Sequence, residues 1–144
     1  MRVLCIACMG ADLPALVLGL TRNLPTSKHD LTVGNEYVVY SICTWAGGTL
    51  HYLVIDDSTG RPSWHPADLF TVEDGSIPDS WRYGYKGYSA DGSPRPILAV
   101  WGYPEMLGPA HHDDLQDRES EAMHVFALRK TEIDRRESMR CSEN

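Results

Sequence analysis

LTVGNEYVVYSICTWAGGTLHYLVIDD, residues 31–57, contains two β-rich runs joined by glycines. Residues 36–45 and 49–55 are mostly β-branched or aromatic, a composition typical of strands. Gly47 and Gly48 lie between the runs and can adopt turn conformations that other residues resist. Both alternating sets of side chains in the first run are largely apolar. The stretch therefore predicts a β-hairpin whose first strand is covered on both faces.

Further short β-rich runs occur at intervals set by turn residues. The opening residues 2–9 indicate a first buried strand, because Asp12 and Pro14 interrupt the apolar run before it could span a bilayer. Residues 61–72 indicate two strands with a tight bend at Pro66, and residues 81–103 one or two more. Short strands separated by turns are typical of a small barrel. We expect a mainly β fold with a barrel over about residues 1–103.

The last thirty residues change to helical periodicity. Apolar residues recur at helical spacing between Leu115 and Ile133, and Asp113 or Asp114 is a suitable N-cap. We expect one amphipathic helix over about residues 115–137, packed on the barrel, and a frayed tail over residues 138–144. A chain of 144 residues with 42% apolar content can build one core, so we expect a single domain over residues 1–144.

The charge balance is acidic. Thirteen Lys and Arg against twenty Asp and Glu give a net charge of −7, the wrong sign for holding a phosphate backbone. Residues 30–92 carry nine acidic and three basic side chains, so the excess lies on the barrel. An acidic surface suits a basic protein partner and disfavours nucleic acid. We expect a cytoplasmic protein without a membrane span, in agreement with four scattered cysteines.

Motifs for metal or catalytic chemistry are incomplete. Cys5 and Cys8 form a C-x-x-C inside a strand-like run, without the second ligand pair that a zinc site needs. His111 and His112 are adjacent and point in different directions on any regular element, which makes a poor chelating pair. We find no nucleophile motif and no phosphate-binding loop. The sequence thus predicts no metal, no cofactor and no catalytic residue.

Two segments resemble a known group of proteins. Residues 31–40 follow the pattern L-T-V-G-x-E-Y-V-V-Y, and residues 64–75 follow W-x-P-A-x-L-F-x-V-x-D-G. These patterns are similar to a widespread group of small, uncharacterised bacterial proteins and to SH3-like barrels in general. The resemblance implies an SH3-like barrel with an aromatic-lined groove, and the group is similar to immunity or antitoxin-like proteins. His65 and Asn35 depart from the pattern, which often has an aromatic residue and a Lys there.

These observations lead to one functional hypothesis and one rival. We expect a non-enzymatic binding protein that sequesters a basic partner, such as a toxin, in the manner of an immunity protein. The rival is a small hydrolase or transferase with an active carboxylate in the Asp56–Asp57 or Asp68–Asp74 region. For each single aromatic residue, burial in the core is the competing interpretation. The expected binding face consists of Tyr37, Trp45, Tyr52, Asp56, Asp57, Asp68 and Asp74.

Overall fold

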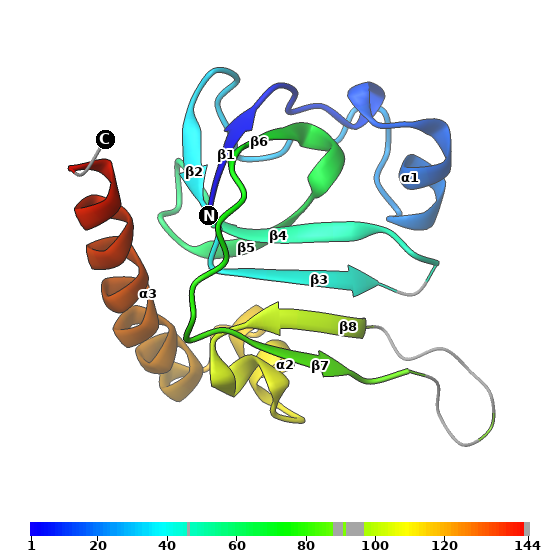
Figure 1. The fold of residues 1–144 in the computed structure, drawn as a ribbon. Helices are drawn as coiled ribbons and strands as arrows, with labels where there is room; N and C mark the ends of the chain where they lie inside the picture. The colour runs from blue at the N-terminus through cyan, green and yellow to red at the C-terminus, as the bar shows by residue number, and fades with distance from the viewer. Residues whose placement is uncertain (46, 88–90, 92–96, 143–144) are drawn as a thin grey trace.

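The computed structural model describes residues 1–45, 47–87, 91 and 97–142, and in this part of the chain the fold is mainly β (Figure 1). Two antiparallel sheets are flanked by a long C-terminal helix. The strands are β1 (Arg2–Cys5), β2 (Glu36–Val38), β3 (Ser41–Trp45), β4 (Leu50–Ile55), β5 (Pro62–Pro66), β6 (Phe70–Asp74), β7 (Arg82–Tyr85) and β8 (Ile97–Gly102). The helices are η1 (Gly10–Asp12), α1 (Ala15–Leu20), η2 (Ala67–Leu69), η3 (Pro104–Leu107), α2 (His111–Gln116) and α3 (Ser120–Cys141).

The predicted hairpin forms between β3 and β4, with Ser41 opposite Leu53. The run predicted as one strand over residues 36–45 is divided, because β2 pairs with β1 and β3 pairs with β4 and β8. Val39 and Tyr40 lie at the bend between β2 and β3, and each hydrogen-bonds toward one of the two sheets. Val39 donates its N–H to the Met1 carbonyl, and Tyr40 donates its N–H to the Leu53 carbonyl. The chain therefore passes from one sheet to the other as a single bent strand.

A second crossing joins the sheets at the predicted bend. Pro66 ends β5, the short helix η2 follows, and β6 then pairs with β1. The strand orders are β2-β1-β6 and β5-β4-β3-β8-β7, so the described residues form two open sheets, and barrel closure stays a prediction. Between the sheets Val3, Val54 and Leu69 are fully buried in one apolar core.

The C-terminal helical region packs on a second apolar core. Phe126 and Ile133 of α3 are buried, and the ring of Phe126 lies 5.4 Å edge-on from the ring of Tyr40. The Tyr40 hydroxyl donates a 2.7 Å hydrogen bond to Asp134 of α3. Near the end of the same helix, buried Glu137 accepts a 2.6 Å bond from the Met1 ammonium group. These contacts fix α3 along one flank of both sheets (Figure 1).

The helix predicted over residues 115–137 is divided at Arg118. This residue has φ = 61°, in the left-handed region, and Glu119 donates its N–H to the Asp114 carbonyl, as at a helix end. The region predicted as a frayed tail remains helical through Cys141. Helix α1 was not predicted, and no described helix is long and apolar enough to span a bilayer.

Candidate functional site

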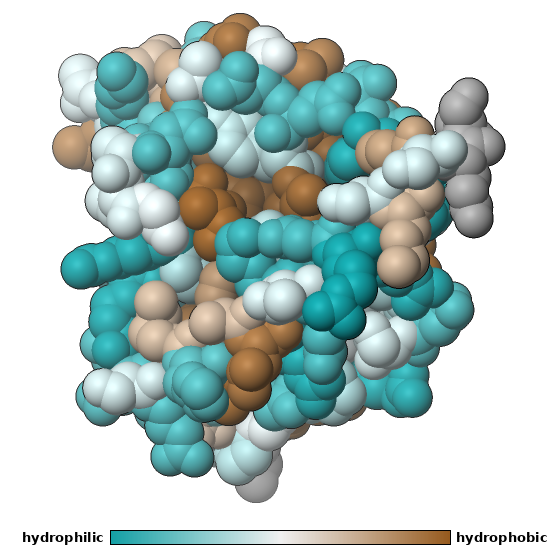
Figure 2. Space-filling model, turned by 90° about the vertical axis from the view of Figure 1, so that its left-hand side faces the viewer, coloured by the Kyte–Doolittle hydropathy of each residue, from teal (hydrophilic) through white to brown (hydrophobic). Residues whose placement is uncertain are grey.

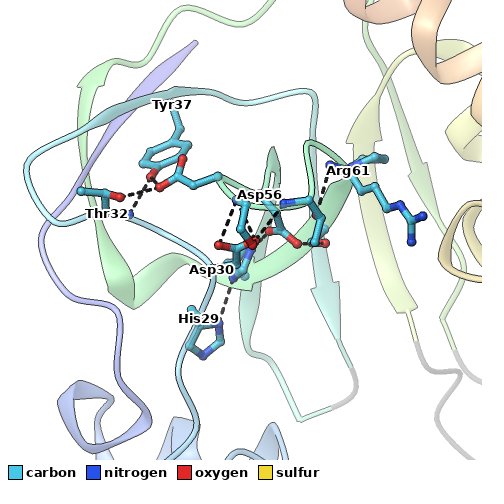
Figure 3. Close-up of polar contacts among 12 residues, drawn as sticks. His29, Asp30, Thr32, Tyr37, Asp56 and Arg61 are labelled. Carbon is cyan, nitrogen blue, oxygen red and sulfur yellow. Dashed lines mark hydrogen bonds and ion pairs between the residues drawn. The ribbon is translucent and has the colours of Figure 1, made fainter.

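Asp56 lies where β4 ends, and both of its carboxylate oxygens accept hydrogen bonds. Oδ1 lies 2.7 Å from Nε2 of His65, and Oδ2 accepts a 2.6 Å bond from the hydroxyl of Ser63. Both partners belong to β5, which is paired with β4. The backbone N–H of Asp56 donates to the Arg61 carbonyl and closes the turn between these strands (Figure 3). This aspartate is therefore a fixed hydrogen-bond acceptor between two strands.

Asp57, the next residue, faces a different group of partners. Its Oδ2 accepts a 2.7 Å bond from the Tyr37 hydroxyl and a 2.6 Å bond from the Thr32 hydroxyl (Figure 3). The Tyr37 oxygen in turn accepts the backbone N–H of Thr32 at 2.8 Å. Burial, with a further contribution from the Asp57 carboxylate, raises the pKa of Tyr37 to about 12. The tyrosine thus stays a neutral donor that holds the aspartate in place.

A third aspartate ties the loop before β2 to the same turn. The carboxylate of Asp30 accepts the backbone N–H and the hydroxyl of Ser58, the latter at 2.6 Å. These bonds to the anionic form lower the pKa of Asp30, and the hydroxyl bond contributes most. The N–H of Asp57 donates to the Asp30 carbonyl. The two segments are thereby clamped against each other.

His65 continues the hydrogen-bond chain inward to His29. Their Nδ1 atoms are 2.8 Å apart, so one ring must donate and the other accept. With both rings neutral, Nε2–H of His65 donates to Asp56, its Nδ1 accepts from His29, and Nε2 of His29 is left as an acceptor. That atom is buried without a partner among the described residues. Burial, with a smaller contribution from His65, lowers the pKa of His29 to about 4.

An open hollow of about 370 Å³ lies between β2, the turn after β4, and α3. Val38 and Ile55 supply its apolar floor, and Glu36 and Asp57 are exposed acidic residues at its edge. Figure 2 looks onto this flank and shows an apolar hollow framed by polar side chains. We call this feature the acidic hollow; its full lining is Glu36, Tyr37, Val38, Tyr40, Ile55, Asp56, Asp57, Gly60 and Lys130.

Cations reach this hollow from two sides. Arg2 of β1 donates to Glu36 at 2.9 Å, and both side chains are partly exposed. Lys130 of α3 bonds to Asp134 and lies 5.7 Å from the centre of the Tyr40 ring. Exposed pairs of this kind contribute little to stability. Lys130 is thus the cation in the lining of the hollow, and Arg2 pairs with Glu36 at its edge.

The seven expected binding residues are not brought together on one face. Asp56, Asp57 and part of Tyr37 line the acidic hollow, although the Tyr37 side chain is only 7% exposed. Tyr52 is 6% exposed and packs on Phe70 in the core between the sheets. The remaining three lie apart from the hollow: Trp45 in a cavity beside α2, Asp68 in a groove beside α1, and Asp74 near Arg140.

The cysteines and histidines considered for metal or redox chemistry are buried or held by contacts with neighbouring side chains. Cys5 is buried, and burial raises the pKa of its thiol, the opposite of what a redox thiol needs. The His111 side chain lies 2.7 Å from the Tyr103 hydroxyl, and buried His112 packs against Trp64. Within the described ranges, no three His, Cys, Asp or Glu side chains are grouped to hold a metal ion.

Sequence reasoning missed His29 and Ser63 as parts of the site. His29 reaches His65 across 36 residues, and no local pattern links the two. His65 was noted only as a departure from an aromatic position. The hydroxyl of Ser63 and the imidazole of His65 alternate with Trp64 along β5, so they share the face that meets Asp56.

Comparisons with family models, with curated proteins and with solved structures gave no match to this chain. The geometry of the described residues is therefore the basis for the functional proposal.

Proposed function

We propose that this chain is a non-enzymatic binding protein that holds a basic segment of a protein partner in the acidic hollow. The observation that carries the proposal is the union of an apolar floor, Val38 and Ile55, with exposed carboxylates at the edge, Glu36 and Asp57. A lysine or arginine side chain has the matching form, because its apolar stem can cover such a floor while its charged head reaches a carboxylate.

The rigidity of the hollow's edge supports this function. Asp57 is oriented by Tyr37 and Thr32, and the adjoining turn is clamped by Asp30. A partner that meets oriented carboxylates loses less conformational entropy than one that must order them. Charge also favours encounter, because a basic partner is steered toward a protein with a net charge of −7.

The scaffold that we propose for this binder is an SH3-like barrel over β1 to β6. A strand that bends between two sheets at Val39–Tyr40 and the short helix η2 between β5 and β6 are consistent with that class. β7 and β8 then extend the β3 edge. Because the fold class hosts many functions, the inhibitory role of an immunity or antitoxin-like protein is a proposal that rests on the hollow. Four free thiols agree with action in the reducing cytoplasm.

Comparative capture from the native host tests the proposal. The wild-type chain and Val38→Trp, which fills the hollow without changing charge, are immobilised side by side, with Val72→Trp as the control. Val72 is a strand valine that is 48% exposed on β6, outside the hollow. A basic protein held by the wild type and by the Val72 variant, and lost from the Val38 variant, is the expected result. Equal retention by all three would place the interface elsewhere.

A second candidate is the small enzyme, and the hydrogen bond between Asp56 and His65 favours it. A carboxylate that orients an imidazole is a common arrangement in acid–base catalysis. Asp56→Asn separates the candidates, because a binder that relies on Asp57 retains its partner whereas an enzyme loses turnover. Circular dichroism must show that the variant is folded, since Asp56 also holds Ser63.

A further inference from the structure

Ser63 also lines a second cavity, of about 210 Å³, between β3 to β5 and the end of α2. Its walls are polar and apolar in similar measure and include two indole rings, Trp45 and Trp64. Three polar side chains join them: Ser63, Gln116 and Arg118. We call it the tryptophan cavity; its remaining lining residues are Leu53, Pro62 and Leu115.

Arg118 is the charged member of this lining, and its position is tightly set. Its guanidinium donates to the Pro62 carbonyl at 2.5 Å and lies 3.4 Å from the Ser63 hydroxyl. The residue occupies φ = 61°, where glycine is preferred at a helix end. A non-glycine residue pays about 1 kcal/mol for that backbone conformation. The contacts of the Arg118 side chain with Pro62 and Ser63 therefore offset the free-energy cost of the left-handed backbone conformation.

The polar groups of the cavity are mainly donors. A guanidinium has five N–H groups, and two bonds to protein leave further donors at Arg118. The indole N–H of Trp64 is buried without a partner among the described residues. The Ser63 hydroxyl already gives its hydrogen to Asp56. A ligand that satisfies this set must bring acceptors and negative charge.

We propose that the tryptophan cavity binds a small aromatic carboxylate. The aromatic ring packs between Trp45, Trp64 and Leu53, and the carboxylate accepts N–H bonds from Arg118. A partly open cavity of this small volume, bounded by a sheet and a helix end, suits a small molecule better than a folded protein segment. Cationic amines are disfavoured beside the guanidinium. This site does not depend on the acidic hollow or on the partner proposed for it.

Titration followed by the indole N–H resonances of the four tryptophans tests the proposal, with phenylacetate as the probe. Trp64→Phe identifies the Trp64 resonance by its loss. We expect saturable shifts of the Trp45 and Trp64 resonances, with Trp81 unmoved because it lies in the other core. Phenylacetamide and benzylamine, which have the same ring and no negative charge, bind at least about tenfold more weakly, since a bond to a charged group is worth about 1.5–3 kcal/mol.

The phenylacetate affinities of two arginine variants test whether Arg118 is the group that binds the carboxylate. Arg118→Gln keeps an amide donor and loses the charge, and it weakens phenylacetate binding at least about tenfold. Arg61→Gln removes an exposed arginine from the neighbouring turn and leaves binding unchanged. If Arg118→Gln fails to fold, the three probes on the wild-type chain decide. Equal affinity for phenylacetamide, or no saturable shift of Trp64, would overturn the proposal and leave Arg118 as a structural tie to β5.

Discussion

Acid should destabilise this protein well above the pH at which carboxylates titrate, because of two buried histidines. His51 is 1% exposed and stacks on Trp45 at 4.0 Å, and His112 is 7% exposed beside Trp64. Burial lowers the pKa of each to about 4, against about 6.5 in the unfolded chain. The unfolded state therefore binds more protons between these values. The stability that the neutral rings provide is complete above about pH 6.5 and falls as the pH drops toward 4.

The size of the effect follows from proton counting. Near pH 5.5 each unfolded histidine carries about 0.9 of a proton and each native one almost none, so two residues give a slope of about 2.4 kcal/mol per pH unit. His29, whose pKa is also lowered to about 4, adds to this slope in the same direction. A change of this size is a large part of the total stability of a typical domain. The loss should therefore be easy to measure by denaturation.

Urea denaturation at pH 7.0, 6.0 and 5.0 provides the assay. His51→Phe keeps a ring against Trp45 and removes one titrating group, so the slope should fall by about 1.2 kcal/mol per pH unit. His124→Gln, at an exposed position of α3, is the control and should keep the wild-type slope. A wild-type free energy of unfolding that is constant from pH 7 to pH 5 would refute the reasoning, as would equal slopes in all three proteins.

Three further predictions concern stability. Arg22, like Arg118, has positive φ (56° against 61°), so Arg22→Gly should stabilise the protein by about 1 kcal/mol in urea denaturation, whereas Arg118→Gly should not, because it also loses the bond to Pro62. Gly10→Ala should cost more than about 2 kcal/mol, since the new Cβ would lie 1.9 Å from the Leu24 carbonyl oxygen, while Gly19→Ala in α1 meets open space and should raise the thermal midpoint. Tyr40→Phe should lower the free energy of unfolding by about 1.5–3 kcal/mol, because the bond to Asp134 is lost. Asp134→Asn should cost less when it is added to Tyr40→Phe than when it is made in the wild-type chain.

The main strands and the C-terminal helix could be predicted because their signals are local. The glycine turn at residues 47–48 and the β-rich runs on either side are sufficient to specify the β3–β4 hairpin. Helix α1 was missed because Leu16 and Leu20 are exposed, so its apolar residues do not mark a buried face. The break at Arg118 was missed because helix ends are recognised by glycine, and an arginine occupies that position here.

The site was less accessible to sequence reasoning than the fold. Asp56 and Asp57 were expected in the binding face or as candidate acids, and in the structure they close the turn and also bind side chains. Tyr52 was expected on a surface groove, but a core enclosed by two sheets has room for its ring. The contact of His29 with His65 depends on the path of the loop before β2, which only the folded chain defines.

The most direct measurement of the central claim is the association rate of the captured partner with two charge-reversal variants over a range of ionic strength. Asp57→Lys changes the edge of the acidic hollow, and Asp68→Lys makes the same change at another exposed aspartate, in the groove beside α1. If the hollow receives a basic segment, Asp57→Lys slows association severalfold or more at low salt and flattens its salt dependence, and Asp68→Lys has a much smaller effect. Equal slowing by both variants would indicate steering by net charge alone, and unchanged rates in both would contradict the assignment of the hollow as the binding site.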